Sequence, residues 1–214
     1  MNANPIVSLE NVGLRIGNTL ILRHAKMTLE PGEKVGLLGP NGSGKTTLLR
    51  MIATLLRPTS GSGEVLGAEL GTDAVYDVRH RIVMVGHLPG LYPELTLGEN
   101  TRFVARLAGR PLELADESLA MVGLAGASER RADQSSKGML RRAELARALI
   151  IEPTLLLLDE AHAGLDAEAI GIVDDIAERV VGAGGAVILV SHEPDRLTVD
   201  RSVQIVDGTL EAVS

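Results

Sequence analysis

The chain of 214 residues contains no cysteine and few aromatic side chains: two tyrosines, one phenylalanine and no tryptophan. The lack of cysteine excludes disulfides and thiolate metal sites and is compatible with a reducing compartment. The hydrophobic core has to be aliphatic, because 45% of the residues are hydrophobic but only 1% are aromatic. That hydrophobic fraction is ample for a core, and we expect residues 1–214 to form a single domain.

Two further absences limit the classes of function. The net charge of −7 argues against a general nucleic-acid-binding surface, which needs a basic patch. No apolar run reaches the roughly 18 residues of a membrane span. The first residues, MNANPIVSLEN, lack the basic start and apolar stretch of a secretory signal. We therefore expect a protein that is soluble by itself and binds no nucleic acid, so that any membrane role comes through partners.

Both ends of the chain predict antiparallel strand pairs. Residues 6–16 and 21–29 have the pattern of two strands joined by a turn at Gly17-Asn18. Residues 201–213 predict a second hairpin around Asp207-Gly208. The first pair indicates an antiparallel β subdomain.

The middle of the chain predicts a parallel α/β unit, and for the whole chain we expect an α/β fold with a mixed central sheet. Continuous apolar runs suit strands that are covered on both faces, and they lie at residues 34–38, 81–85, 154–159 and 186–191. Between residues 97 and 149, Ala, Leu, Arg and Glu recur at helical spacing. This segment is therefore predicted to be a helical subdomain inserted between sheet strands.

The stretch GPNGSGKTT follows the first of these apolar runs and precedes a helical pattern. It satisfies G-x-x-x-x-G-K-[ST], in which glycines let backbone N–H groups turn toward phosphates at a helix N-terminus. Lys45 is placed to neutralise phosphate charge, and the Thr46 hydroxyl to bind Mg²⁺. The strand–loop–helix context argues against a chance glycine turn. The predicted phosphate site comprises Gly39, Pro40, Asn41, Gly42, Ser43, Gly44, Lys45, Thr46 and Thr47.

A second apolar run, TLLLLDE, ends in the carboxylates of Asp159 and Glu160. Unpaired buried charge is costly, so acidic residues at this point need a reason. Asp159 can enter the Mg²⁺ shell, while Glu160 can orient and activate a water for attack on a γ-phosphate. The alternative is a strand that simply ends in solvent with acidic residues, which the neighbouring phosphate loop disfavours.

Ser136 and Gly138 stand near the start of the stretch 135–149, just ahead of its amphipathic helical pattern. A hydroxyl and a free N–H at the positive end of a helix make a second anion site. The alternative is an ordinary serine N-cap, which is the simpler interpretation of these residues alone. One chain has no use for two γ-phosphate sites unless two copies face each other.

In this order the motifs resemble the ATP-binding subunit of ABC transporters over nearly the whole chain. GPNGSGKTT resembles the Walker A loop, LLLLDE the Walker B strand with its catalytic glutamate, and SSKGM the L-S-G-G-Q signature. AGLD resembles the D-loop and ends in Asp166, and VSHE places His192 as the switch histidine that senses the γ-phosphate. The resemblance implies an ATPase whose two copies pair head to tail, with ATP and Mg²⁺ between one Walker A loop and the partner's signature.

The resemblance also implies a place in the cell and a partner. Members of this family drive separate transmembrane permease subunits, so we expect a peripheral protein on the cytoplasmic face of the inner membrane. The competing classes are a soluble ABC-type ATPase acting on ribosomes or DNA, and a P-loop kinase of small molecules. A kinase leaves Ser136, Gly138 and the Asp159-Glu160 pair unexplained.

Some positions depart from the family pattern. The signature has Ser135 and Met139 where Leu and Gln are usual, while Ser136 and Gly138, which touch the γ-phosphate in the family, are kept. Ile16 stands near the place of an aromatic that often stacks on adenine. We therefore expect an aliphatic contact with the base instead of stacking.

Three histidines lie among these motifs. DEAHAGLD lacks the proline usual after the glutamate, and we interpret its His162 as a loop residue. The alternative for His192 is a surface residue at a strand end. His87 takes the place of a glutamine that approaches Mg²⁺ and the attacking water, and a neutral ring nitrogen can still accept there.

The surroundings of His87 point to a subgroup. GHLPG, followed by ELT and EN, resembles the ATPase of the cytochrome c-biogenesis haem exporters. This resemblance implies haem export as the transport function. The alternative is a tolerated substitution in an exporter of drugs or lipids.

Overall fold

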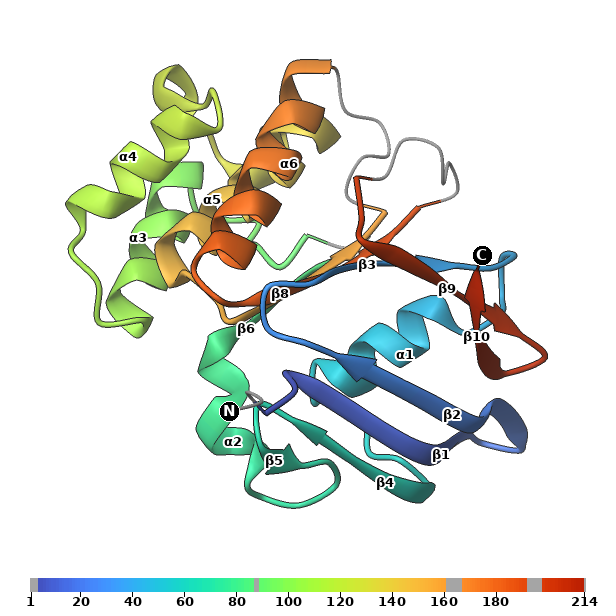
Figure 1. The fold of residues 1–214 in the computed structure, drawn as a ribbon. Helices are drawn as coiled ribbons and strands as arrows, with labels where there is room; N and C mark the ends of the chain where they lie inside the picture. The colour runs from blue at the N-terminus through green and yellow to red at the C-terminus, as the bar shows by residue number, and fades with distance from the viewer. Residues whose placement is uncertain (1–3, 87–88, 161–166, 192–197, 214) are drawn as a thin grey trace.

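The computed structural model describes residues 4–86, 89–160, 167–191 and 198–213, and its strands form two sheets (Figure 1). The antiparallel sheet has the order β2-β1-β4-β5. Its strands are β1 (Val7–Ile16), β2 (Thr19–Leu29), β4 (Ser60–Val65) and β5 (Ala68–Glu69). The central sheet has the order β10-β9-β3-β8-β7-β6. Its strands are β3 (Lys34–Leu38), β6 (Ile82–Val85), β7 (Leu155–Asp159), β8 (Ala186–Val190), β9 (Arg201–Val206) and β10 (Thr209–Val213).

The central sheet is mixed, as the sequence predicts. Strand β3 runs parallel to β8 and β9, and β7 runs parallel to β6 and β8, whereas β10 returns antiparallel to β9. Every residue of β7 and β8 is buried. Side chains alternate between the two faces of a strand, so Leu155 and Leu157 belong to one hydrophobic core while Leu156 and Leu158 belong to another. A sheet covered on both faces explains why the apolar runs are continuous.

The antiparallel sheet contains the expected hairpin and two strands that the sequence pattern does not reveal. Ile16 pairs with Thr19 across the turn, so β2 begins two residues earlier than predicted. Strand β4 has the sequence SGSGEV, which lacks the alternation that marks a strand. Pairing with β1 defines it, and the two strands approach closely at Gly13, where a Cβ would lie 2.4 Å from Ser60 Oγ.

Helices lie on both sides of the central sheet. The α-helices are α1 (Lys45–Ile52), α2 (Val75–Val78), α3 (Leu97–Leu107), α4 (Glu113–Met121), α5 (Lys137–Ile151) and α6 (Ala167–Gly182). Short 3₁₀ helices span Arg79–Arg81, Ala125–Ala127 and Ala132–Gln134. The predicted helical segment therefore contains α3, α4 and α5, and its last helix extends two residues beyond residue 149. Within the described residues, no helix combines the length and apolar character that crossing a membrane requires.

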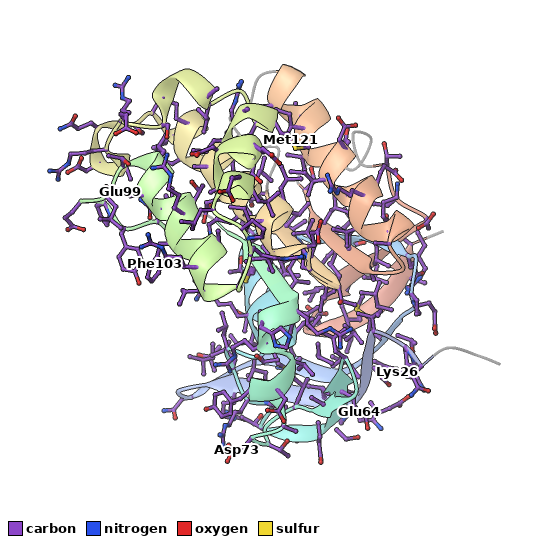
Figure 2. All side chains as sticks on the ribbon, turned by 90° about the vertical axis from the view of Figure 1, so that its left-hand side faces the viewer. Lys26, Glu64, Asp73, Glu99, Phe103 and Met121 are labelled. Atoms are coloured by element: carbon purple, nitrogen blue, oxygen red, sulfur yellow. The ribbon has the colours of Figure 1, made fainter. Side chains whose placement is uncertain are left out.

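The helical part and the antiparallel sheet lie at opposite ends of the molecule (Figure 1). Figure 2 shows the same division from the side, with Glu99, Phe103 and Met121 on the helical part, Glu64 in strand β4 of the antiparallel sheet and Asp73 beside that sheet. The central sheet lies between them. The ends of the central strands therefore lie where side chains from both the helical part and the antiparallel sheet can reach them.

Candidate functional site

The loop between β3 and α1 has a backbone that glycine alone adopts without strain. Gly39, Gly42 and Gly44 have φ angles of 141°, 79° and 105°. Gly44 is the N-cap of α1 in the left-handed conformation, and a Cβ there would lie 2.8 Å from Ile21 Cγ2. A Cβ on Gly39 would lie 2.8 Å from Ser43 Oγ. The loop thus curls tightly at the N-terminus of α1, which is the geometry that exposes backbone N–H groups to an anion.

The side chains of Ser43 in this loop and of Lys45 at the start of α1 indicate a ligand with several oxygen atoms. Lys45 is only 6% exposed, and its Nζ donates to the carbonyl oxygens of Gly39, at 2.6 Å, and Pro40, at 2.9 Å. The buried Ser43 Oγ has no hydrogen-bond partner among the described residues. A buried hydroxyl normally has a partner. An ammonium group and an unsatisfied hydroxyl on one anion-binding loop fit the phosphates of a nucleotide.

Two of the predicted magnesium ligands, Thr46 and Asp159, meet. Thr46 lies in the first turn of α1, and its Oγ1 donates to Asp159 Oδ2 at 2.7 Å across a sequence separation of 113 residues. Asp159 ends β7 and is 1% exposed. A hydroxyl and a carboxylate are hard oxygen ligands of the kind that Mg²⁺ prefers. The residues present therefore fit the metal, and Thr46 and Asp159 would hold it.

Glu160 follows Asp159 directly and has an unusual backbone. Its φ angle is 54°, in a region that residues other than glycine seldom occupy. The backbone is held from two sides: its N–H donates to the Val190 carbonyl at 3.1 Å, and its carbonyl accepts from Arg141 Nη2 at 3.3 Å. Strained residues persist only where surrounding contacts fix them, and they are common in active sites. The backbone at Glu160 is fixed by β8 and α5.

Within one chain, Ser136 acts as a helix cap. It precedes α5, and its Oγ accepts from the Met139 N–H at 3.2 Å, as the simpler interpretation of the sequence has it. The cap leaves the hydroxyl proton available, and among the described residues a Cβ on Gly138 would meet only Ser136 Oγ, at 4.0 Å. The surface over the first turn of α5 is therefore open to an anion brought by another molecule. The predicted contact with a partner's γ-phosphate stays a prediction.

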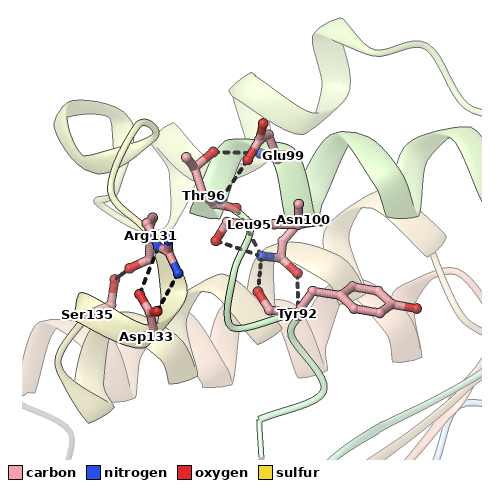
Figure 3. Close-up of polar contacts among 8 residues, drawn as sticks. All are labelled: Tyr92, Leu95, Thr96, Glu99, Asn100, Arg131, Asp133 and Ser135. Atoms are coloured by element: carbon pink, nitrogen blue, oxygen red, sulfur yellow. Dashed lines mark hydrogen bonds and ion pairs between the residues drawn. The ribbon is translucent and has the colours of Figure 1, made fainter.

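The segment before this cap is anchored to the helical part. Ser135, at the position where leucine is usual, donates to the Arg131 carbonyl at 2.8 Å, and Arg131 pairs with Asp133 at 2.6 Å (Figure 3). The hydrogen bond and charge of Asp133 raise the pKa of Arg131. The serine substitution thus replaces an apolar side chain by a hydrogen bond that orders the approach to the cap.

A buried amide orders the segment that leads into α3. Asn100 is 2% exposed, and its Oδ1 accepts from the Tyr92 N–H at 2.7 Å. Its Nδ2 donates to the carbonyls of Tyr92 and Thr96, at 3.0 and 2.9 Å (Figure 3). Thr96 and Glu99 form a capping box at the start of α3. The sequence shows the capping box, but the role of Asn100 depends on contacts that only the fold provides.

The other predicted residues are placed apart or are not described. Ile16 is half-exposed at the end of β1. A cavity of about 670 Å³ adjoins the phosphate loop, and its lining includes Ile21, Asn41 and Gln204 but not Ile16. The base contact of Ile16 stays a prediction. His87, His162, Asp166 and His192 lie outside the described residues.

The sequence interpretation missed a charged cluster on α5. Arg141, Glu144 and Arg147 lie three residues apart, on one face of the helix, and Glu144 is 2% exposed. The carboxylate of Glu144 accepts from the Gly90 N–H at 2.7 Å. An acidic residue inside an otherwise buried helical stretch is the signal that could have shown it.

Comparison with known proteins identifies a family. The sequence model of the family described as ABC transporter matches residues 22–163. The chain is 37% identical to the daunorubicin resistance ATP-binding protein DrrA3 of Streptomyces coeruleorubidus, over 98% of this chain and 70% of that protein. It is 34% identical to the cytochrome c biogenesis ATP-binding export protein CcmA of Agrobacterium fabrum, over 93% of this chain and 94% of that protein.

The chain is also similar to an Fe(3+) ions import ATP-binding protein and to two solved structures. The chain is 39% identical to the Fe(3+) ions import ATP-binding protein FbpC of Photorhabdus laumondii, and it spans about half of that protein, 48%. A structure described as the ATP binding subunit of an ABC transporter superposes with a TM-score of 0.88 at 25% identity, covering 97% of this chain and 90% of the other. A dimeric ATP-binding cassette in a post-hydrolysis state, bound to ADP and Pi, superposes with a TM-score of 0.84 at 26% identity, covering 97% and 99%.

Proposed function

Because the chain belongs to the ABC transporter family and is an ATPase of that family, we propose that two copies of it power a membrane transporter. The observation that carries the assignment of residues is the hydrogen bond between Thr46 and Asp159. It joins the phosphate loop to the end of β7, so that one Mg²⁺ would be held by both elements. When bound, Mg²⁺ supplies the positive charge that neutralises phosphate oxygens.

Different side chains would then bind the phosphates, activate the attacking water and contact the metal. Lys45 would exchange its loop carbonyls for phosphate oxygens, and the N–H groups of the loop from Gly39 to Thr47, other than at Pro40, would bind the same phosphates. Glu160 would orient the attacking water and accept its proton. His87 and His192 would contact the metal and the γ-phosphate, as the family resemblance implies.

We further propose that the site is completed by a second copy in head-to-tail orientation. Ser136 and Gly138 of one copy would contact the γ-phosphate bound at Lys45 of the other, and Asp166 would lie at the same interface. The open first turn of α5 and the dimeric solved relative support this arrangement.

The transport partner would be a separate transmembrane permease, with this chain at the cytoplasmic face of the inner membrane. The match with the cytochrome c biogenesis protein over almost all of both chains supports haem export. A second candidate is drug export, which the higher identity to the daunorubicin resistance protein supports.

Purification of the tagged chain from membranes tests the partner. We expect a six-span permease to co-purify, together with cytochrome c-maturation proteins if the cargo is haem. Recovery with ribosomes, and with no membrane protein, would contradict a transport function. Recovery of a permease without cytochrome c-maturation proteins would favour the drug exporter.

A further inference from the structure

The charged cluster on α5 is connected to the segment that leaves β6. Glu144 Oε1 accepts from the Gly90 N–H at 2.7 Å, and Arg147 Nη1 donates to the Gly90 carbonyl at 3.3 Å. Arg141 Nη1 donates to the carbonyl of Gly86, the residue that follows β6. Both ends of the segment 86–90 are therefore held by side chains of one helix.

The same helix also contacts the backbone of Glu160, the proposed general base. Arg141 Nη2 donates to the Glu160 carbonyl at 3.3 Å, so one guanidinium bridges the ends of β6 and β7. Such a planar fork can serve two acceptors in fixed directions. Arg141 thus links the backbone before His87 to the backbone of Glu160.

Burial makes this arrangement specific. The side chains of Arg141 and Glu144 are 11% and 3% exposed, and Arg141 and Arg147 approach the Glu144 carboxylate at 3.8 and 3.5 Å. Burial raises the pKa of Glu144, while the Gly90 N–H and the two arginines oppose that rise. A buried carboxylate with such partners cannot move freely, since each displacement would leave a charge without compensation.

Gly90 fits closely into the cluster. A Cβ on this residue would lie 2.6 Å from Arg147 Nη1 and 3.6 Å from Glu144 Oε1. The absence of a side chain lets the guanidinium and the carboxylate reach the backbone. Glu144 and Arg147 therefore contact the backbone at a position that a residue with a side chain could not occupy without a clash.

We propose that Arg141 and Glu144 are positioning residues for ATP hydrolysis, which hold the backbone on both sides of His87 and at Glu160 in a fixed relation to α5. The inference rests on the proposed roles of Glu160 and His87. Arg141 acts through two carbonyls, and Glu144 acts through the Gly90 N–H and by fixing the arginines. Neither side chain needs to touch the nucleotide.

The test compares Arg141→Lys and Glu144→Gln with the matched control Arg102→Lys. Lysine keeps the positive charge near Glu144, but an ammonium group cannot reproduce the fork. Arg102 pairs with Asp116 at 2.8 Å in a more exposed place on α3, away from the proposed machinery. The measurements are kcat and KM for ATP, and hydrogen–deuterium exchange of peptides that cover residues 82–95.

We expect kcat to fall about tenfold to a hundredfold in both test variants, as for a catalytic group displaced by a fraction of an ångström to 1 Å. KM should change by less than about twofold, because the phosphate loop is untouched. Exchange in segment 86–90 should become faster. The Arg102→Lys control should show none of these changes. If Glu144→Gln does not fold, Arg141→Lys decides the question.

A double variant shows whether Arg141 acts through Glu160. In a Glu160→Gln background, Arg141→Lys should lower turnover much less than it does in the wild-type protein. If Arg141→Lys leaves kcat unchanged, or raises KM only, the inference is overturned and the proposed function stays intact. Near wild-type turnover in Glu160→Gln alone would instead overturn the proposed function.

Discussion

Thr46 Oγ1 and Asp159 Oδ2 lie 2.7 Å apart, although one belongs to the first turn of α1 and the other to the end of β7. The contact places two of the predicted metal ligands at the junction of a phosphate-binding loop and a buried strand. Each is fixed by its own element, so the fold itself sets the position of the pair. Such preorganisation is the property expected of a catalytic metal site.

Removal of the Thr46 hydroxyl tests this relationship. Thr46→Val keeps the shape of the side chain but deletes one oxygen ligand. We expect the Mg²⁺ concentration for half-maximal ATPase activity to rise about tenfold, the lower end of the effects seen at metal sites. Thr72→Val is the control, since the Thr72 hydroxyl donates to the Glu69 carbonyl away from the loop. An unchanged Mg²⁺ requirement in Thr46→Val would remove Thr46 from the metal site.

The head-to-tail arrangement predicts complementation between two inactive variants. Ser136→Arg should abolish activity because a bulky cation blocks the predicted second anion site, and Lys45→Ala should abolish ATP binding because phosphate charge is left uncompensated. A heterodimer of the two has one intact site, formed by the loop of the first and the helix cap of the second. We expect the mixture to regain activity from about one site per heterodimer. Heterodimers that form but stay inactive would contradict the arrangement or the independence of its sites.

How much of the site the sequence predicts depends on the range of the contacts. β3 matches its predicted bounds, and β7 and β8 match within a residue or two, because apolar runs without alternation indicate strands buried on both faces. Strand β4 was not predicted, because its serines and glycines give no alternation of apolar and polar residues. Only its pairing with β1 defines it. Local motifs single out Asp159 and Thr46 as a pair of metal ligands, and the fold brings the two side chains into contact.

The contacts of α5 could not be predicted in the same way. The spacing of Arg141, Glu144 and Arg147 is visible in the sequence, but their acceptors and donors are backbone groups of Gly86, Gly90 and Glu160. A backbone partner leaves no mark of its own in a side-chain pattern. Such tertiary contacts emerge only when the helix packs against the sheet.

Glu144 should make stability depend on pH. Because burial raises its pKa in the folded state, the folded protein binds this proton more tightly than the unfolded chain does. Its contribution to stability is complete below the unfolded pKa, about 4.3, and is lost as pH rises through the folded value. The free energy of unfolding of the wild type relative to Glu144→Gln should therefore decrease as pH rises from about 4.

Urea unfolding of both proteins across that range measures the difference. Arg141 and Arg147 face this carboxylate, and both remain in the Glu144→Gln variant, so the comparison isolates Glu144. Parallel stability curves for wild type and Glu144→Gln would show that the pKa of Glu144 is not raised.

His87 yields a prediction about activity and pH. If a neutral ring nitrogen contacts Mg²⁺ or its water, protonation removes the acceptor and repels the metal. Activity should fall as pH drops through the range in which histidine ordinarily titrates, near ~6.5. His87→Gln should keep most of the activity and lose part of this acid sensitivity, which separates it from any titration of His192. His87→Ala with unchanged ATPase and transport would show that the loop merely tolerates histidine.

The central claim is that Glu160 activates water in a site completed by a second copy, and the Glu160→Gln variant tests it most directly. Glutamine keeps the size of the side chain but cannot accept the proton, so turnover should fall about 10²–10⁴-fold while ATP binding persists. Bound ATP that is not hydrolysed should then hold two copies together, and light scattering should detect a dimer that forms only with ATP. Turnover near the wild-type rate, with no ATP-dependent dimer, would contradict the account.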